Sequence, residues 1–130
     1  MNTNFLYSEI TDLILKAFFK VYNKLGHGFL EKVYENAMII ELNRLGLRCE
    51  KQKKIDVYYD EFLIGEYYAD ILVNEVVVVE LKAAETLVPE HEVQLVNYLR
   101  GTDLEVGLLL YFGKGPQFKR KVLTKEFKKK

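Results

Sequence analysis

The sequence has 130 residues, which is enough for one domain and too few for a second core, so we predict a single domain over residues 1–130. A hydrophobic fraction of 49% and a charged fraction of 29% exclude wholesale disorder. No apolar run approaches the roughly 18 residues of a membrane span, and the first residues lack a basic signal-peptide region. Cys49 is the single cysteine, which excludes an internal disulfide and a cysteine-cluster zinc site, and we expect a cytosolic (cytoplasmic) protein.

Basic residues gather toward the C-terminus, although the 19 basic and 19 acidic residues cancel overall. From Lys114 onward eight Lys or Arg residues face Glu126 alone, so this end carries +7 and the preceding body −7. A basic tail over residues 118–130 is suited to holding a phosphate backbone. The same lysine run is also typical of a solvated, partly frayed terminus.

The first part of the chain predicts two helices followed by a hairpin. Apolar residues at helical spacing indicate a helix between Ser8, as N-cap, and Gly26, just after its last turn. A second helix is expected over about 29–45. Two strands follow, Cys49–Tyr59 and Phe62–Val73, with a tight turn between them.

The later elements predict a mixed sheet. A third strand over 76–82 is nearly continuous valine, which is typical of the interior of a sheet. A helix over Pro89–Arg100 leads to a last strand over 104–112. Strands joined through such a helix are usually parallel. We therefore expect an α/β fold with an antiparallel three-strand meander, one added parallel strand, and helices on both faces.

Charged side chains end the valine-rich strand. Glu80 and Lys82 share one face because alternate residues of a strand point the same way, and strand ends in α/β sheets are where sites gather. Asp70 lies on the preceding strand. A two-residue turn at 74–75 would separate Asp70 from Glu80, whereas a three-residue loop over 74–76, or a bulge near Asp70, places them together. We predict that they converge.

Convergence would create a divalent-cation site. Mg²⁺ takes oxygen ligands and usually only one or two protein carboxylates, which Asp70 and Glu80 supply, with the Leu81 carbonyl as a further oxygen. Lys82 would then orient or deprotonate a water, or stabilise charge developing on phosphorus. The alternative for Lys82 is a salt bridge to Glu80 or another acid.

Two helices offer further polar residues. Glu31 falls on the apolar side of its helix, where a carboxylate must be paired or bound to metal; a capped or snorkelled structural role is the alternative. His91, Gln94 and Tyr98 share one stripe of the later helix, where Gln94 and Tyr98 could together reach a phosphate or a base. The alternative is that Tyr98 packs in the core and Gln94 caps a strand.

These residues resemble a known family. Residues 28–34 carry the Gly-x-x-Glu-x-x-Tyr signature of the GxxExxY family, ending at Tyr34. Blocks at 68–70, 79–83 and 91–99 resemble later parts of the same family, so the likeness covers about residues 10–112 in order. That family looks like a branch of the PD-(D/E)XK nuclease superfamily, whose restriction-endonuclease-like core is αβββαβ. The order predicted above agrees, with one extra N-terminal helix.

The resemblance implies roles for the residues already singled out. Asp70 stands for the metal-binding Asp, Glu80 and Lys82 for the (D/E)-x-K motif, and Leu81 for the carbonyl between them. Glu31 stands for the acidic residue of the first core helix. Substrate contacts are expected from the Gln-x-x-x-Tyr element and its neighbours; these are Gln94, Tyr98, His91 and Tyr34. Ala69 replaces the usual proline.

The resemblance implies a Mg²⁺- or Mn²⁺-dependent nuclease that acts on DNA or RNA. Two alternatives stay open on the same fold: a catalytically inactive nucleic-acid-binding module and a protein-interaction module. Because the chain is small and offers little surface to a long duplex, a homodimer or a partner protein is also expected.

Overall fold

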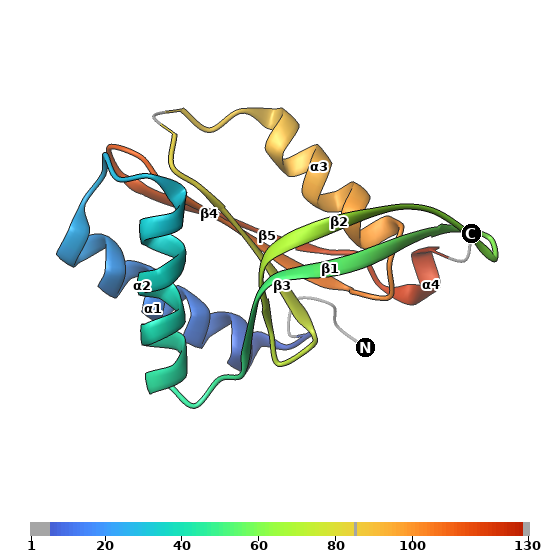
Figure 1. Ribbon diagram of the computed structural model, residues 1–130, viewed down its shortest axis with the longest axis horizontal. Coiled ribbons are helices and arrows are strands. Elements are labelled where there is room, and N and C mark those ends of the chain that lie inside the picture. Colours follow the sequence, from blue (N-terminus) through green and yellow to red (C-terminus); the bar gives the residue numbers. More distant parts are fainter. Residues whose placement is uncertain (1–5, 85, 129–130) are drawn as a thin grey trace.

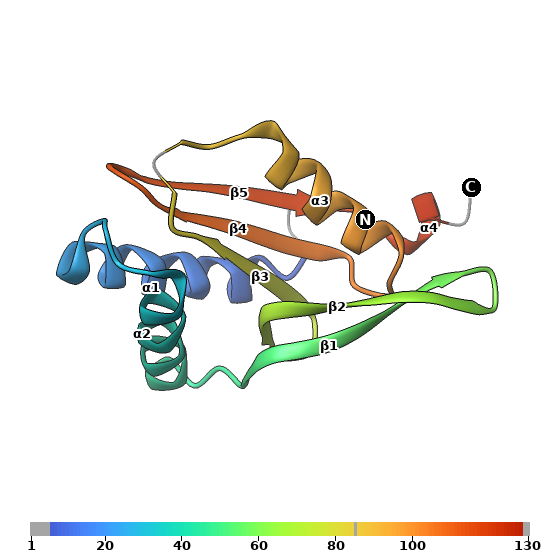
Figure 2. The ribbon, with the colours of Figure 1, turned by 45° about the horizontal axis from the view of Figure 1, so that its top comes forward.

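The computed structural model describes residues 6–84 and 86–128 (Figure 1). The helices are α1 (Ser8–Leu25), α2 (Glu31–Arg44), α3 (Pro89–Arg100) and α4 (Lys125–Lys128), and the strands are β1 (Cys49–Tyr59), β2 (Phe62–Val73), β3 (Val77–Lys82), β4 (Val106–Phe112) and β5 (Pro116–Val122). The strands form one sheet in the order β1-β2-β3-β4-β5 (Figure 2). Only β3 and β4 are parallel, because α3 crosses between them.

Two hydrophobic layers sandwich the sheet. Figure 1 shows α1 and α2 on one side of the strands and α3 on the other. Alternate residues of β3 serve the two layers, since Val77 and Val79 pack toward α1 and α2 while Val78 packs with Leu95 and Leu99 of α3. This double burial explains why the strand is almost pure valine.

The predicted order of helices and strands is confirmed up to Phe112, with small changes at the ends. Helix α1 begins at Ser8 and its N-cap is Tyr7, which has a left-handed φ of 54°, so Ser8 is not the cap. Strand β3 begins at Val77 because Val76 belongs to the preceding turn. Gly26 follows α1 with a φ of 66°, as predicted.

The expected basic tail over 118–130 is corrected. Most of its first part is β5, which pairs antiparallel with β4 along the whole of that strand. A lysine-rich segment is typical of a solvated end, but also of the edge strand of a sheet, where charge blocks further pairing. Lys121 of β5 also pairs with α3, because its Nζ lies 2.7 Å from Glu92 Oε1.

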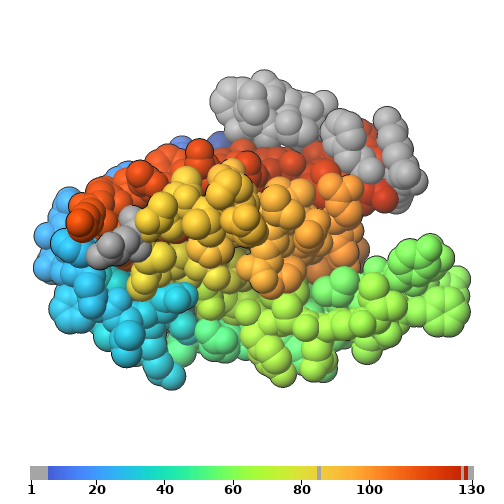
Figure 3. Space-filling model, turned by 90° about the horizontal axis from the view of Figure 1, so that it is seen from above, coloured from blue at the N-terminus to red at the C-terminus, as the bar shows by residue number. Residues whose placement is uncertain are grey.

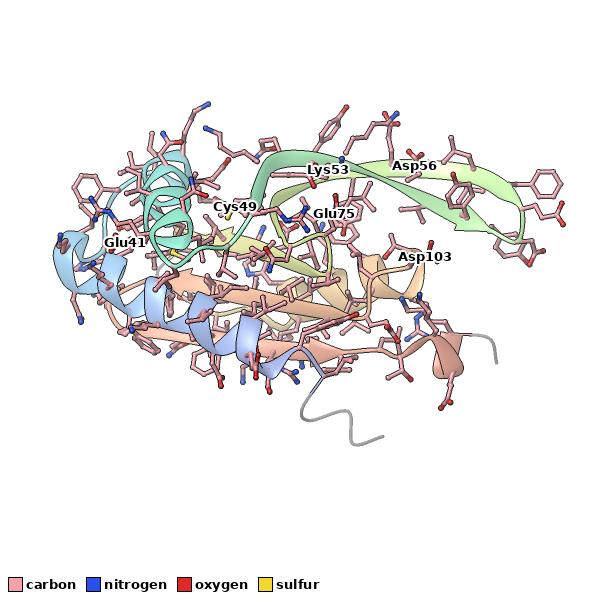
Figure 4. All side chains as sticks on the ribbon, turned by 90° about the horizontal axis from the view of Figure 1, so that it is seen from below. Glu41, Cys49, Lys53, Asp56, Glu75 and Asp103 are labelled. Carbon is pink, nitrogen blue, oxygen red and sulfur yellow. The ribbon has the colours of Figure 1, made fainter. Side chains whose placement is uncertain are left out.

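The β1–β2 hairpin extends past the body of the molecule, and its tip projects freely in the space-filling view (Figure 3). A cavity of about 660 Å³ lies between the part of β1 that approaches the hairpin turn and the end of α3. Asp56 of β1 and Asp103 of the loop after α3 line it from opposite sides (Figure 4). In the described part of the chain, no helix is both long enough and apolar enough to cross a membrane.

The phenol of Tyr34 anchors the loop that leads into α2. Its side chain is fully buried, and its ring stacks on Phe112 with the centroids 4.0 Å apart. The hydroxyl donates to the Gly26 carbonyl at 2.7 Å and accepts from the Phe29 N–H at 3.2 Å. The expectation that Tyr34 contacts substrate is therefore corrected, because a buried hydroxyl with both partners in the backbone has no surface to offer.

Tyr34→Phe should leave the Gly26 carbonyl and the Phe29 N–H without their buried partner. We expect the free energy of unfolding to fall by about 1–2 kcal/mol, measured by urea denaturation. Tyr68→Phe, on an exposed side chain, is the matched control and should unfold like the parent. Equal stability of the two variants would contradict the anchoring role.

Candidate active site

The β2–β3 turn sets which residues face each other. Asn74 and Glu75 adopt left-handed φ angles of 50° and 61°, and the Val76 N–H donates to the Val73 carbonyl at 3.0 Å. Val73 pairs with Val77 and the ladder continues to residues 71 and 79. This is the three-residue loop, so the pairing register that places Asp70 beside Glu80 is confirmed.

Asp70 and Glu80 form the centre of the site. Asp70 Oδ2 accepts a hydrogen bond from the Leu81 N–H at 2.8 Å. Glu80 is only 9% exposed, and its Oε1 is buried with no hydrogen-bond partner among the residues that the structure describes. Burial first, and then the charge and hydrogen bond of Asp70, raise the pKa of Glu80 to about 9 against the lowering effect of Lys82. The pair therefore needs a proton or a cation at neutral pH.

Lys82 and Glu31 border this pair. Lys82 is half-buried, and no ion pair joins it to a carboxylate within residues 6–84 and 86–128, so the salt-bridge alternative finds no partner there. Desolvation raises the pKa of Glu31, while the Lys82 charge lowers it and the Asp70 charge raises it. The Ala83 N–H also stabilises the Glu31 carboxylate. Glu31 therefore lies within electrostatic range of both Lys82 and Asp70.

Glu31 differs from the expectation in its exposure. We expected an inward, enclosed carboxylate, whereas the side chain is exposed as a whole. The reason is that α2 begins at Glu31, so the apolar arc that buries Tyr34 and Met38 does not extend over its first residue.

Helix α3 brings His91 and Tyr98 toward the carboxylates. Tyr98 stacks on Tyr67 of β2 with centroids 3.7 Å apart and the rings 8° from parallel. Desolvation first, and then the charges of Glu80 and Asp70, raise the pKa of Tyr98. The ring thus packs against Tyr67, but Tyr98 is half-buried and not part of the core that one alternative expected, and its hydroxyl lies within the field of the site.

His91 and Gln94 occupy the first turns of α3. His91 Nδ1 shares a hydrogen bond with the Tyr111 hydroxyl. Burial, followed by the Lys82 charge, lowers the pKa of His91, which keeps the ring neutral near pH 7. Gln94 is exposed and available to a ligand. The roles of His91, Gln94 and Tyr98 toward substrate stay predictions.

Two residues of the site had no assigned role in the sequence. Glu35 is buried on α2, and Gln52 of β1 donates from Nε2 to Glu35 Oε2 at 3.1 Å and to Asp70 Oδ1 at 3.4 Å. Glu35 lies one turn after Glu31, near the same arc, which was a weak signal. No sequence signal pointed to Gln52, since a polar residue in a lysine-rich strand is ordinary.

The donor set fits a hard divalent cation held by few protein ligands. Within the described residues, no group of three or more His, Cys, Asp and Glu side chains is spaced to hold a metal ion. Mg²⁺ needs only one or two protein carboxylates and completes its shell with water and substrate oxygens. Asp70 and Glu80, with the unpartnered Glu80 oxygen, meet that smaller requirement.

Comparison with known proteins agrees with this geometry. Residues 8–123 match the family model of the PD-(D/E)XK nuclease superfamily. The solved structure "Crystal structure of SSO0001" has a TM-score of 0.55 at 16% identity, over 72% of this chain and 50% of that one. The chain thus spans about half the length of that protein, and the likeness shows the fold. No curated protein matches the sequence. The predicted restriction-endonuclease-like α/β fold is confirmed.

The raised pKa of Glu80 makes stability depend on pH. Between the ordinary value of 4.5 and about 9, the folded chain holds a proton that the unfolded chain releases. This stabilisation is therefore complete below 4.5 and is lost as the pH rises toward 9. Glu80→Gln cannot ionise and should raise the metal-free unfolding free energy near pH 8 by on the order of 1–3 kcal/mol.

Urea unfolding near pH 6 and near pH 8, in chelator-treated buffer, measures this effect. The advantage of Glu80→Gln should grow between the two pH values. Glu90→Gln changes an exposed carboxylate of the same type. Its unfolding free energy should change with pH in the same way as that of the parent chain. An advantage that is absent or independent of pH would contradict the burial argument.

Proposed function

Because this chain belongs to the PD-(D/E)XK nuclease superfamily, we propose that it hydrolyses phosphodiester bonds of DNA or RNA with Mg²⁺ or Mn²⁺ as cofactor. The observation that carries the proposal is the meeting of Asp70 and Glu80 at the end of β3. Glu80 there holds one buried oxygen, Oε1, that no donor among the described residues satisfies. A buried carboxylate oxygen without a partner is costly, and a divalent cation would remove that cost.

The metal would be held by Asp70, Glu80 and the Leu81 carbonyl, with Glu31 as a further carboxylate at the border. When bound, the cation would acidify a water and offset charge on the scissile phosphate. Asp70 keeps one oxygen on the Leu81 N–H, which fixes the direction of the other. Glu31 lies in the field of both Lys82 and Asp70, so it is placed to hold a water.

Lys82 would orient the attacking water and stabilise the charge that develops on the phosphate oxygens. Its ammonium is not engaged in an ion pair with any carboxylate that the structure describes. A lysine already neutralised in a salt bridge would have less to offer an anion. The Lys82 charge acts on His91, whose lowered pKa keeps its ring neutral. Of these two neighbours, only Lys82 therefore carries a positive charge.

The substrate would pass across the ends of α2 and α3. A hollow of about 200 Å³ lies between the loop at Phe29 and Leu30 and the segment at Ala83. Leu30 and Ala83 directly adjoin Glu31 and Lys82 in the sequence. The lining of the hollow mixes apolar side chains with His27, which would suit a sugar or a base. Gln94 and Tyr98 would contact the strand on the α3 side.

The finer assignments remain proposals. Membership of the GxxExxY branch rests on the signature that ends in Tyr34. A cytosolic location rests on a sequence with only Cys49, and a homodimer or partner protein rests on small size. The competing function is a binding module without activity, and the absence of a three-ligand cluster within residues 6–84 and 86–128 is the observation that favours it.

Cleavage of labelled single-stranded, duplex and branched DNA and RNA tests the proposal. With about 5 mM Mg²⁺ or 1 mM Mn²⁺, we expect the parent chain to cut at least one substrate. Lys82→Ala and Asp70→Asn should each lower the rate by at least about 100-fold, the scale of removing one transition-state partner.

Lys32→Ala, on an exposed lysine of α2, serves as the charge-matched control and should cut like the parent. Binding of nucleic acid by the parent without cleavage in either metal, together with no calorimetric metal binding, would replace the nuclease with the binding module. Native mass in the same buffers would show whether a dimer forms.

A further inference from the structure

Gln52 interrupts the ladder between β1 and β2, which has a second irregularity farther along, at Val57 and Tyr58. Its neighbours pair normally, Lys51 with Ile71 and Lys53 with Ala69, so Gln52 stands at the register position of Asp70. Its φ is +50°, in the left-handed region that a residue with a Cβ rarely adopts. An unfavourable backbone conformation inside a strand calls for a compensating interaction.

The compensation is made by the side chain. Gln52 Nε2 donates to Asp70 Oδ1 at 3.4 Å and to Glu35 Oε2 at 3.1 Å. Asp70 Oδ2 is already held by the Leu81 N–H at 2.8 Å. Both oxygens of Asp70 are thus positioned, one by β3 and one by β1.

Glu35 is the second carboxylate that accepts from the Gln52 amide. It is 6% exposed, comes from α2, and has no protein partner for Oε1. A buried carboxylate tends to be retained where it has a task, because its burial is otherwise destabilising. Here it accepts from Gln52, so the amide cannot rotate away from Asp70.

We propose that Gln52 and Glu35 are positioning residues that hold Asp70 in its cation-binding orientation; this inference rests on the proposed metal-dependent function. The choice of an amide has a physical reason. A lysine or arginine between the two carboxylates would neutralise the charge that attracts the cation, whereas a neutral amide orients Asp70 and leaves its charge intact. Neither Gln52 nor Glu35 needs to touch the substrate.

A purely structural role would be to tie α2 to β1. The chain supplies a matched control for that role, because Lys51 Nζ donates to Asn36 Oδ1 at 2.8 Å. This bond joins the same two elements and does not reach Asp70. Lys51→Ala therefore removes a tie of the same kind without disturbing the proposed metal ligand.

The test measures Mn²⁺ affinity by calorimetry, the Mn²⁺ concentration for half-maximal cleavage, and the unfolding temperature. Gln52→Gly removes the amide and tolerates the positive φ, so its backbone is relaxed rather than strained. We expect Gln52→Gly and Glu35→Leu to weaken Mn²⁺ binding about tenfold, as loss of a ligand's hydrogen-bond partner does. Half-maximal cleavage should need correspondingly more metal.

Stability separates the two roles. Glu35→Leu replaces a partly unsatisfied buried carboxylate, so its unfolding temperature should hold or rise while metal affinity falls. Glu35→Gln keeps an oxygen that accepts from Gln52 and should stay within about twofold of the parent affinity, as should Lys51→Ala.

Parent-like Mn²⁺ affinity in Gln52→Gly would overturn the inference, and so would an equal loss in Lys51→Ala. The proposed function fails separately: a parent chain that neither binds Mn²⁺ nor cleaves, with Asp70→Asn indistinguishable from it, would remove the metal site and this inference together. If Asp70→Asn lost Mn²⁺ binding while Gln52→Gly and Glu35→Leu kept it, the proposed function would stand and the positioning role would be rejected.

Discussion

The pairing register of β2 with β3 is the constraint on which the site depends. Side chains alternate along a strand, so a slip of one residue would turn Glu80 to the opposite layer from Asp70. The left-handed turn at Asn74 and Glu75 holds the register. Asn74 is itself held, since its N–H donates to the Arg48 carbonyl and its Oδ1 accepts from the Arg48 N–H, both at 2.8 Å. Asparagine is suited to this position because it tolerates left-handed backbone.

The apolar strand that stabilises the fold also determines the chemistry of Glu80. Valines on both faces of β3 exclude water, β4 covers one edge along the whole strand, and β2 covers the other edge as far as Val79. The carboxyl at its end is consequently desolvated, which raises its pKa to about 9. The same dry packing that strengthens the sheet makes an ionised Glu80 unfavourable, and under the proposed function a bound cation would offset that cost.

Periodicity and spacing were enough to predict the order of helices and strands up to Phe112, including the bounds of α3 and the parallel placement of β4. They left the turn after Val73 open between two and three residues, and the three-residue loop that was favoured is the one that the structure has. These features depend on the direction of successive side chains, which the periodicity of the sequence predicts, and on the usual parallel pairing of strands that a helix connects.

The features that were missed depend on tertiary context. Whether a lysine-rich segment is a tail or an edge strand depends on an available partner strand, and β4 provides one to β5. Tyr34 belongs to the signature yet is buried, because its hydroxyl finds two backbone partners in a loop that no periodicity describes. Gln52 adopts a left-handed conformation within a strand, a choice that arises from contacts with distant residues rather than from its own neighbours.

The divergence of the hairpin from the sheet explains why a site exists at this place. β1 and β2 pair over nearly their whole length, whereas β2 pairs with β3 only through residues 71–73 and 77–79. Beyond that point the hairpin leaves β3 and continues away from the body (Figure 2). The Leu81 N–H, which β2 no longer reaches, is satisfied by the side chain of Asp70 instead. Gln52 leaves the β1–β2 ladder without a pair at the position of Asp70. Beside β3, a backbone bond of the ladder is thus replaced by a bond to the Asp70 carboxylate, which is one of the proposed metal ligands.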